Sequence, residues 1–247
     1  MFLVGRTLLA CSLAVVAQTA TANTVSVVFV GNSLTQVNDL PAVLKQFAAR
    51  SVSPMEVETN AITPGGAFLY DQWKRGQAPA LLREKHPNFL VLQGQSTEPL
   101  SAPKSFAQCA GLFKTEADRV GARTILFATW ARPAGDIYYK EPTSGGSPAA
   151  MQAGLNSACA AVARNISAVL APVGAAFERA QHDMPEIQLL DGTQHPSSAG
   201  TYLAAAVLFH AMFNTSPIGS SYYSDLPKET ATRLQRLADE TSILLPK

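Results

Sequence analysis

Three residues of types that together activate a hydroxyl nucleophile stand at two places in the sequence. Ser33 follows an apolar run in VVFVGNSLTQ, and Asp191 and His195 lie close together in DGTQHPS. A serine hydroxyl becomes an effective nucleophile when an adjacent base takes its proton. A histidine whose tautomer is fixed by a carboxylate can act as that base. We therefore expect Ser33 to attack an acyl carbon, His195 to take its proton and Asp191 to orient the imidazole.

Ser33 and His195 also have ordinary structural roles as alternatives to the catalytic ones. Serine at a strand-to-helix turn is commonly a helix N-cap, and this alternative stays open for Ser33. His195 precedes a proline at a helix entry, so it could serve as a cap as well. The other histidines fit the role of base less well, because His86 lies in a loop, His182 in a polar turn and His210 on a helix without a partner nearby.

The elements that must position these side chains alternate along the chain. Continuous apolar runs, typical of strands buried on both faces, are separated by segments with helical spacing. The sequence predicts strands at Val25–Val30, Met55–Thr59, Phe89–Gln93, Thr124–Thr129 and Ile187–Leu190. It predicts helices at Leu40–Arg50, Phe68–Glu84, Pro103–Val120, Met151–Leu170, Ser198–Phe213 and Glu229–Leu244.

This alternation predicts an α/β fold, a three-layer α/β/α sandwich with a flavodoxin-like parallel sheet. In such sheets ligands lie beyond the carboxyl ends of the strands. Polar or turn-forming segments fall at those ends, at residues 31–33, 60–66, 93–96, 129–132 and 191–197. Ser33, Asp191 and His195 are therefore expected on one rim of the sheet.

The five segments, in this order, resemble the SGNH (GDSL-like) hydrolase superfamily. The similarity lies in GNSLT after the first strand, a glycine pair after the second, a glutamine-containing loop after the third, and a late Asp…His-Pro-Ser. The phrases LVLQGQSTEP, ATWARP and HPSSAGTYLAA resemble a poorly characterised bacterial branch and the carbohydrate O-acetylesterase branches. The resemblance spans roughly Val27 to Phe213. It implies a carboxylic ester hydrolase that works through an acyl-enzyme and needs no metal or cofactor.

The resemblance also implies donors for the negative oxygen of the tetrahedral intermediate. These are the backbone N–H of Ser33, the N–H of a glycine and a side-chain amide. Gly66 is preferred over Gly65 for the second donor. Gln93 is preferred over Gln95 for the third, where many members have Asn. A simple Pro-Gly-Gly turn and a glutamine that only satisfies loop backbone are the structural alternatives.

Two features depart from the family pattern. Asn32 stands where the family name has Asp, a change that the resembling branch tolerates. Three residues separate Asp191 from His195, whereas the family has two. Gly192 could let the extra residue bulge outward, and Asp183 is the alternative acid if Asp191 holds the histidine poorly.

Residues after the fourth predicted strand form a candidate substrate wall. Trp130, Arg132 and Tyr138 stand beside the Pro/Gly/Ser-rich loop ARPAGDIYYKEPTSGGSP, with core and surface roles as the alternative. No wide apolar run is present to bury an acyl chain, so a small acyl ester, such as an acetylated glycan, is favoured over a lipid. An acyltransferase using the same nucleophile and an inactive glycan-binding relative remain alternatives. A flavodoxin-like phosphate site is a further alternative.

The first residues and the charge balance limit the class of protein further. Residues 1–22 contain one Arg, an apolar run and small residues before the expected cleavage site, as in a signal peptide. The segment ending at Cys11 resembles a lipoprotein box, but only four residues separate Cys11 from Arg6. We expect an exported protein, periplasmic or secreted, with one hydrolase domain over residues 23–247.

The charge balance of the mature chain argues against nucleic acid or membrane partners. Loss of Arg6 from the 19 basic residues leaves 18 basic residues against 18 acidic ones, which gives no electrostatic footprint for nucleic acid or membrane.

Two cysteines remain after removal of the leader. Cys109 and Cys159 could pair in an oxidising compartment, although spacing alone does not place them within bonding distance. They lack histidines at ligand spacing, so no zinc site is expected. Nothing in the sequence indicates an oligomeric state.

Overall fold

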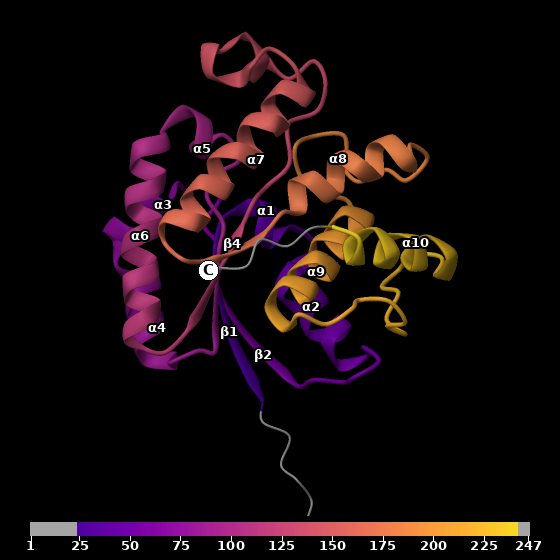
Figure 1. Cartoon of the computed structure of the whole chain (residues 1–247), viewed down its shortest axis with the longest axis horizontal. Coiled ribbons are helices and arrows are strands. Elements are labelled where there is room, and N and C mark those ends of the chain that lie inside the picture. Colours follow the sequence, from indigo (N-terminus) through magenta and orange to yellow (C-terminus); the bar gives the residue numbers. More distant parts are fainter. Residues whose placement is uncertain (1–23, 242–247) are drawn as a thin grey trace, which may run out of the picture.

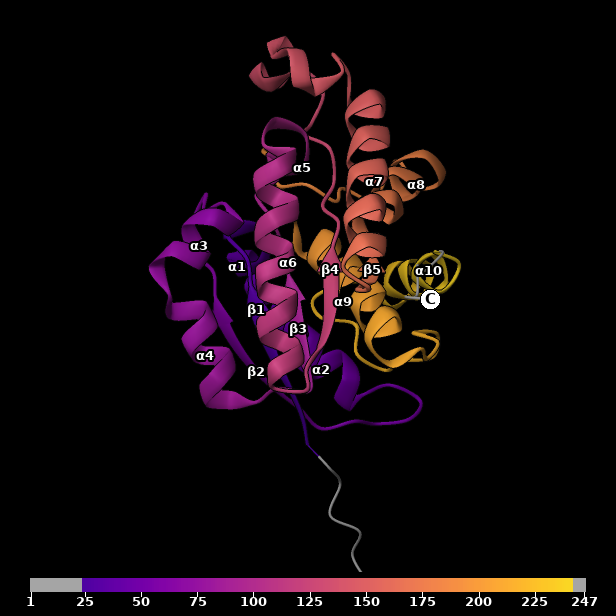
Figure 2. The ribbon, with the colours of Figure 1, turned by 60° about the vertical axis from the view of Figure 1, so that its left-hand side comes forward.

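A parallel sheet runs through the centre of the molecule (Figures 1 and 2). The computed structural model describes residues 24–241, so the expected signal peptide and Cys11 lie outside the described residues. The strands are β1 (Val25–Val30), β2 (Val57–Ile62), β3 (Phe89–Leu92), β4 (Arg123–Phe127) and β5 (Val169–Ala171). Their order across the sheet is β2-β1-β3-β4-β5, and every neighbouring pair is parallel. The topology therefore places all strand carboxyl ends at one rim.

Helices cover both faces of the sheet and confirm the predicted α/β/α sandwich. Their bounds are α1 (Ser33–Gln36), α2 (Leu40–Ala49), α3 (Leu69–Arg75), α4 (Gln77–Lys85), α5 (Glu98–Ser101), α6 (Pro103–Arg119), α7 (Pro148–Asn165), α8 (Val173–Asp183), α9 (Ser198–Phe213) and α10 (Lys228–Asp239). Figure 1 shows α3, α4 and α6 on one side of the sheet and α2, α9 and α10 on the other. Short 3₁₀ turns occur at Val37–Asp39, Ile137–Lys140 and Pro142–Ser144.

Alternation along each strand divides the core in two. Val27 and Phe29 of β1 pack with α2, α8, α9 and α10, whereas Val28 and Val30 pack with α3, α4, α6 and α7. All four side chains have no exposed surface. A strand with two buried faces needs apolar residues on both of them, which is why Val27 to Val30 are apolar without a break. The sheet is thus fixed from both sides, and the turn that follows β1 starts from a rigid base.

The structure corrects the predicted boundaries in the second half of the chain. The helix expected to reach Leu170 ends at Asn165, because Ser167 adopts a left-handed conformation (φ 54°) and Val169–Ala171 then forms β5. The end of the predicted helix overlapped this strand of three residues, and no element was predicted from the sequence for the helix α8 after it. The strand predicted at Ile187–Leu190 is also wrong, because that segment forms only one isolated bridge, between Leu190 and Pro196.

The helix predicted over Phe68–Glu84 is two helices. Gly76 separates α3 from α4 with a positive φ of 73°, a conformation that glycine adopts without steric cost. The Gly76 N–H bonds the Trp73 carbonyl at 3.1 Å and closes the end of α3. The break lets α3 and α4 each pack against α6.

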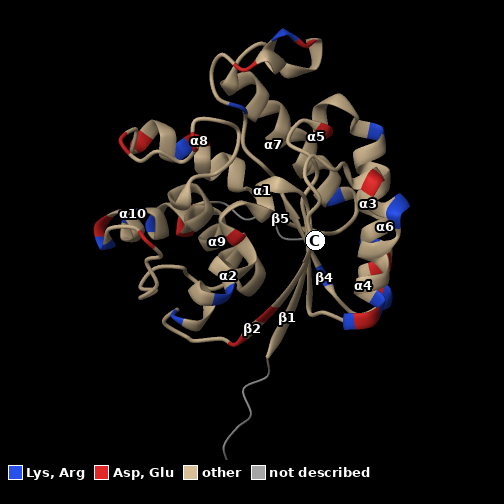
Figure 3. Ribbon diagram, turned by 180° about the vertical axis from the view of Figure 1, so that it is seen from behind, with Lys and Arg blue, Asp and Glu red and all other residues tan. Residues whose placement is uncertain are grey.

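Surface charge is mixed, and the two cysteines are buried. Figure 3 shows acidic and basic positions interspersed along the helices seen from behind. Cys109 and Cys159 are free thiols, and burial raises the pKa of Cys159 to about 12. None of the helices described between residues 24 and 241 is long and apolar enough to cross a membrane.

Candidate active site

Ser33 begins α1 directly after β1, and its hydroxyl faces His195. The N-cap of α1 is Asn32, whose Oδ1 accepts the Leu34 N–H at 3.1 Å. The capping alternative for Ser33 is therefore wrong. Ser33 Oγ instead lies 3.0 Å from His195 Nε2. A strand-to-helix turn thus brings together two residues separated by 162 positions.

Gln93 supports this turn from the end of β3. Its Oε1 accepts the Asn32 N–H at 3.0 Å and the Thr35 hydroxyl at 2.9 Å. Its Nε2 donates to Asn32 Oδ1 at 3.1 Å and to the Gly94 carbonyl. Both amide hydrogens of this buried side chain are therefore used within the turn. The expectation that Gln93 donates to an oxyanion needs correction, since it braces the residue that precedes the nucleophile.

The glycine before Asn32 makes this bracing possible. A Cβ on Gly31 would lie 2.7 Å from Gln93 Oε1 and 2.7 Å from Thr35 Oγ1. Real Cβ atoms do not approach other atoms so closely, so any larger residue would displace the glutamine. Gly31 is thus required by close approach of side chains rather than by its backbone angles.

The loop after β2 carries the glycine pair. Asn32 Nδ2 donates to the Ala67 carbonyl at 3.2 Å, which holds this loop against the start of α1. Gly66 has a positive φ of 68°, and both Gly65 and Gly66 face open space. Among residues 24–241, the backbone N–H groups of Ser33 and Gly66 donate to no protein acceptor. The first N–H groups of a helix have no intrahelical partner, so Ser33 N–H is a free donor at the rim.

The third candidate donor is the neighbouring glutamine. Gln95 Oε1 accepts from the Thr97 N–H at 2.6 Å and the Thr97 hydroxyl at 2.8 Å. Its Nε2 forms no hydrogen bond within the described part of the chain, in contrast to the Nε2 of Gln93. The side-chain amide left free after β3 is therefore that of Gln95.

A buried carboxylate joins the loops after β2 and β3. Glu98 has no exposed surface and accepts the Leu69 N–H at 3.1 Å and the Gln95 N–H at 2.9 Å. Burial raises the pKa of Glu98, and its hydrogen bonds from Gln95 and Leu69 oppose that shift. The residue sits between the loop of Gly66 and the segment of Gln95, so it fixes both relative to the sheet.

The stability conferred by Glu98 should fall as the pH rises. Its pKa in the folded chain lies above the ordinary 4.5, so the folded state binds the proton more tightly than the unfolded state. This contribution is complete below the unfolded pKa and is lost as the pH rises through the raised value. Urea unfolding between pH 4.5 and 7.5 should show the difference in unfolding free energy between wild type and Glu98→Gln shrinking with pH. A difference that is constant or grows would contradict this.

Asp191 and His195 lie in a tight loop that enters α9. The loop is closed by the Asp191 N–H, which donates to the His195 carbonyl at 3.1 Å, and by the bridge from Leu190 to Pro196. Gly192 takes a positive φ of 94°, which turns the chain within the loop. The spacing of three intervening residues is thus accommodated by a left-handed glycine.

Thr193 stands between the acid and the base. Its hydroxyl donates to Asp191 Oδ1 at 2.6 Å and lies 3.1 Å from His195 Nδ1. Asp191 Oδ1 also accepts the Thr193 N–H at 2.9 Å, and the bonds from Thr193 lower the pKa of this carboxyl. Among the described residues no hydrogen bond joins the Asp191 carboxylate to the His195 ring.

The alternative acid and the other histidines lie elsewhere. Asp183 ends α8, where it pairs with Arg179 at 3.2 Å and with the exposed His182 at 2.8 Å. The hydrogen bond with His182 lowers the pKa of Asp183 most, and the hydrogen bond from Arg179 lowers it further. Asp183 is therefore engaged at the C-terminus of its own helix and does not bond His195.

Asn38 fixes the histidine loop to the nucleophile segment. It follows α1 in a left-handed conformation (φ 58°), and its Nδ2 donates to the Pro196 carbonyl at 2.8 Å and to Thr201 Oγ1 at 3.0 Å. Pro196 directly follows His195. The short 3₁₀ turn after α1 therefore ties the segment of Ser33 to the loop of His195.

The three candidate wall residues contribute mainly to the scaffold of the rim. Trp130 is 3% exposed, stacks on Phe177 at 4.1 Å, and donates its Nε1–H to the Gln194 carbonyl at 3.0 Å. Its buried face is thus not open to a sugar ring. Tyr138 lies under the Arg132 guanidinium, 5.8 Å from ring centroid to Cζ.

Arg132 connects three segments of the rim. Its guanidinium donates to Ser96 Oγ at 3.2 Å, Asp136 Oδ2 at 3.3 Å and Gln194 Oε1 at 3.0 Å. These partners follow β3, follow β4 and precede His195, respectively. The side chain is 17% exposed, and its Nη1 and Nη2 groups bond these three partners.

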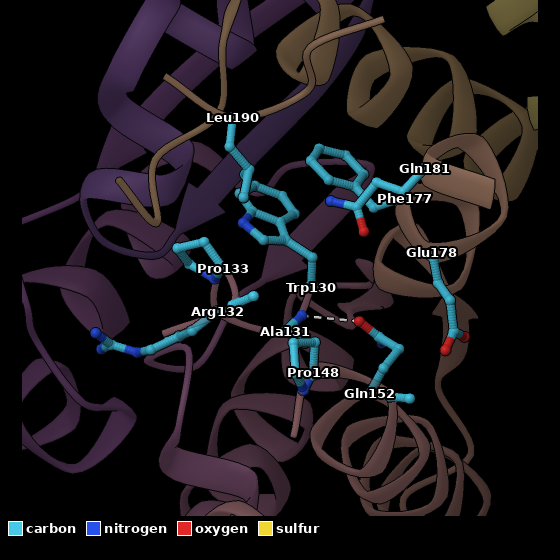
Figure 4. Close-up of a pocket in the computed structure, with 12 residues that line it drawn as sticks. Trp130, Ala131, Arg132, Pro133, Pro148, Gln152, Phe177, Glu178, Gln181 and Leu190 are labelled. Carbon is cyan, nitrogen blue, oxygen red and sulfur yellow. Dashed lines mark hydrogen bonds between the residues drawn. The ribbon is translucent and has the colours of Figure 1, made fainter. Parts of the chain in front are cut away.

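A hollow of about 420 Å³ lies beside the histidine loop, where the segment after β4 meets α7 and α8 (Figure 4). Leu190, Trp130, Pro133 and Phe177 line its apolar part, and the Ala131 N–H bonds Gln152 Oε1 at 2.8 Å. In Figure 4 the Arg132 side chain runs away from the polar residues of α8. Ser33 and His195 are not among its lining residues. The hollow is thus separate from the nucleophile.

Sequence reasoning missed Thr193, Gln194 and Glu98. Thr193 stands inside the DGTQH segment, where a hydroxyl between acid and base was a visible signal. Nothing in the local pattern indicated that Glu98 is buried, since the residue stands before Pro99 at the start of the short helix α5. Within residues 24–241 no three His, Cys, Asp or Glu side chains gather as a metal-binding group.

Comparisons with solved structures identify proteins with the same fold. A protein from Slackia heliotrinireducens assigned to the SGNH hydrolases shares 30% sequence identity with the chain, over 77% of this chain and 100% of that one, with a TM-score of 0.64. A DUF4886 family protein from Bacteroides uniformis is 15% identical over 88% and 94% of the two chains, with a TM-score of 0.75.

A third similar structure is a catalytic mutant of an acetylxylan esterase from Geobacillus stearothermophilus. It is 12% identical over 76% of this chain and 94% of that chain, with a TM-score of 0.60. At identities this low the second and third similarities show the fold alone. No family model matches the chain, and no curated protein matches it by sequence.

Proposed function

Because the chain belongs to the SGNH hydrolases, we propose that it is a serine esterase that hydrolyses small acyl esters, above all acetyl esters of carbohydrate. The observation that carries the proposal is the 3.0 Å contact between Ser33 Oγ and His195 Nε2. This is hydrogen-bond distance for a nucleophile and its base. If residues 1–22 direct export, as their sequence predicts, the enzyme meets its ester in the periplasm or outside the cell.

The first half of the reaction forms an acyl-enzyme. Ser33 Oγ attacks the ester carbonyl carbon while His195 Nε2 takes the hydroxyl proton. The carbonyl electrons move to oxygen and give a tetrahedral intermediate. When the intermediate collapses, the C–O bond to the alcohol breaks and His195 returns the proton to the leaving alcohol oxygen.

The second half releases the acid. Water attacks the acyl carbon and gives its proton to His195, and collapse of the second intermediate returns that proton to Ser33 Oγ. On the far side of the histidine ring, Nδ1 contacts the Thr193 hydroxyl, which donates to the Asp191 carboxylate. The reaction consumes one ester and one water, releases one alcohol and one acid, and returns Ser33 and His195 to their starting forms.

The negative oxygen is stabilised by donors aimed at the rim. The Ser33 N–H and the Gly66 N–H are the two backbone donors in this proposal, which their lack of protein acceptors among the described residues supports. Gln95 replaces Gln93 as the side-chain donor, because the amide of Gln93 is already used. Loss of one such donor in a related hydrolase mechanism costs roughly 3–4 kcal/mol of barrier.

The preference for a small acyl group is supported by the surroundings of Ser33. The nearby hollow is lined by neither Ser33 nor His195, so it offers no channel for a long acyl chain from the nucleophile. Solved structures with the same fold include acetylxylan esterases. An acetyl group on a polysaccharide is the substrate that fits both observations.

The first test is turnover of p-nitrophenyl acetate, butyrate and octanoate, followed by release of acetate from acetylated xylooligosaccharide. We expect kcat/KM to fall from acetate to octanoate, and free acetate to be the product. Preference for octanoate would contradict the small-acyl assignment. Acetate recovered only on an added sugar acceptor would instead indicate an acyltransferase.

A fluorophosphonate probe separates the remaining alternative. Adduct formation at Ser33, located by peptide mass spectrometry, is expected for an activated nucleophile whatever the natural ester. A folded protein that neither turns over any ester nor reacts with the probe would be the inactive glycan-binding relative.

A further inference from the structure

The hydroxyl of Thr193 occupies the place beside the His195 ring where a triad carboxylate is expected. Thr193 Oγ1 lies 3.1 Å from Nδ1, on the opposite side of the ring from the contact between Nε2 and Ser33 Oγ. The Asp191 carboxylate lies beyond the threonine, 2.6 Å from the same hydroxyl. The three groups and Ser33 therefore form one chain of hydrogen bonds.

The number of hydrogens that Thr193 can donate determines which group donates in each of these hydrogen bonds. A threonine hydroxyl has one hydrogen to donate and two lone pairs to accept. The ionised Asp191 can only accept, so the Thr193 hydrogen points to Oδ1. The His195 backbone N–H donates to Thr193 Oγ1 at 3.1 Å and uses one lone pair. The remaining contact, with Nδ1, is favourable only when Nδ1 carries a hydrogen and donates it to Thr193.

This direction selects the tautomer of the histidine. With the hydrogen on Nδ1, the neutral ring presents the bare Nε2 lone pair to the Ser33 hydroxyl. That is the form which accepts the proton of the nucleophile. We propose that Thr193 is a positioning residue that holds His195 in this reactive tautomer, and that Asp191 acts on the histidine only through Thr193.

The extra residue in the loop explains why a threonine can take this role. Gln194 separates Thr193 from His195, and it is held at both ends: Trp130 Nε1–H bonds its carbonyl at 3.0 Å and Arg132 bonds its Oε1 at 3.0 Å. With Gln194 fixed, Thr193 is turned back so that its hydroxyl reaches the histidine ring. The proposal rests on the esterase mechanism above, because only that reaction gives the tautomer its catalytic meaning.

The kinetic test compares variants that keep or remove the hydroxyl. Thr193→Val keeps the shape but loses the donor and acceptor, and should lower kcat by roughly 10²- to 10⁴-fold, the range of general acid–base catalysis, with KM nearly unchanged. Thr193→Ser should recover most of the activity. Thr232→Val is the matched control, because Thr232 is a half-buried threonine on α10 whose hydroxyl donates to the Lys228 carbonyl at 2.8 Å. That variant should retain wild-type kcat.

A double variant tests whether Asp191 works through Thr193. Asn at position 191 still offers an oxygen to Thr193, so Asp191→Asn alone should cost less than Thr193→Val. In the Thr193→Val background, Asp191→Asn should cause no further loss of kcat, because residues that act in series are not additive. A full additional loss in that background would overturn the proposal, as would wild-type kcat in Thr193→Val.

Nuclear magnetic resonance of the ¹⁵N-labelled imidazoles gives a readout independent of turnover. Long-range ¹H–¹⁵N spectra, assigned to His195 by comparison with His195→Gln, should show the Nδ1–H tautomer in wild type and Thr193→Ser, and its loss in Thr193→Val. An Nε2–H tautomer in wild type would overturn the role of Thr193. The Nδ1–H tautomer in a protein that turns over no ester would instead support the hydrogen-bond chain and contradict the esterase.

Discussion

Ser33→Ala is expected to abolish ester turnover, with kcat reduced by on the order of a millionfold, as when the nucleophile of a serine hydrolase is removed. The loss is large because every later step requires the bond that Ser33 Oγ forms. The fold should not change. Ser33 Oγ has His195 as its only protein partner among the described residues, and Asn32 caps the helix. The unfolding free energy should therefore stay within about 0.5 kcal/mol of wild type.

The measurement is steady-state turnover of p-nitrophenyl acetate together with urea unfolding of the same preparations. Ser198→Ala is the matched control, since Ser198 is also the first residue of a helix at this rim, in α9. That variant should retain turnover. Activity that survives in folded Ser33→Ala would show that another group is the nucleophile.

Gly200→Ala should produce a large loss of stability. A Cβ at this position would lie 2.2 Å from the Leu189 carbonyl oxygen and 3.0 Å from Phe177 Cζ. The carbonyl cannot move freely, because it accepts the Ser197 N–H at 2.9 Å at the start of α9. We expect a loss of about 3 kcal/mol, the upper end for overpacking, and a fall in Tm of roughly 6–12 °C for a chain of this size.

Turnover should fall as well, because Leu189 leads into the loop of Asp191 and His195. Thermal unfolding and kcat at a temperature well below Tm would separate the two effects. Gly111→Ala in α6 is the control, since the nearest atom to its Cβ would be Ile166 Cγ2 at 3.9 Å. There alanine should raise stability by about 0.5–1 kcal/mol, the usual gain in a helix interior. A stable Gly200→Ala variant would mean that α9 can shift away from the loop.

The sequence predicted those parts of the site that follow from strand and helix patterns. VSVVFV is apolar at nearly every position, so β1 and the position of Ser33 after it could be derived from the pattern alone. The helix Ser198–Phe213 was predicted with its observed bounds. Its sequence, SAGTYLAAAVLFHAMF, is largely apolar, and the structure buries most of it. Its start places His195 at the same rim.

What escaped prediction depends on contacts between distant segments. The engagement of Gln93 by Asn32 and Thr35 becomes evident only when β1 and β3 lie side by side. The strand β5 has three residues, too few for a periodic signal, and it follows a helix without a clear break. The role of Thr193 depended on a loop geometry that spacing alone left open.

Because Arg132 ties the loops of the rim together, these loops lose their conformational entropy on folding rather than on substrate binding. Arg132 joins its own segment, which follows β4, to the segment after β3 and to the segment before His195, and without it the three would fluctuate separately. Their freedom is restricted when the chain folds, before any ester arrives. Little reorganisation of the rim then remains for the moment at which charge develops on the substrate oxygen. The position of His195 is in this sense set by folding rather than by substrate binding.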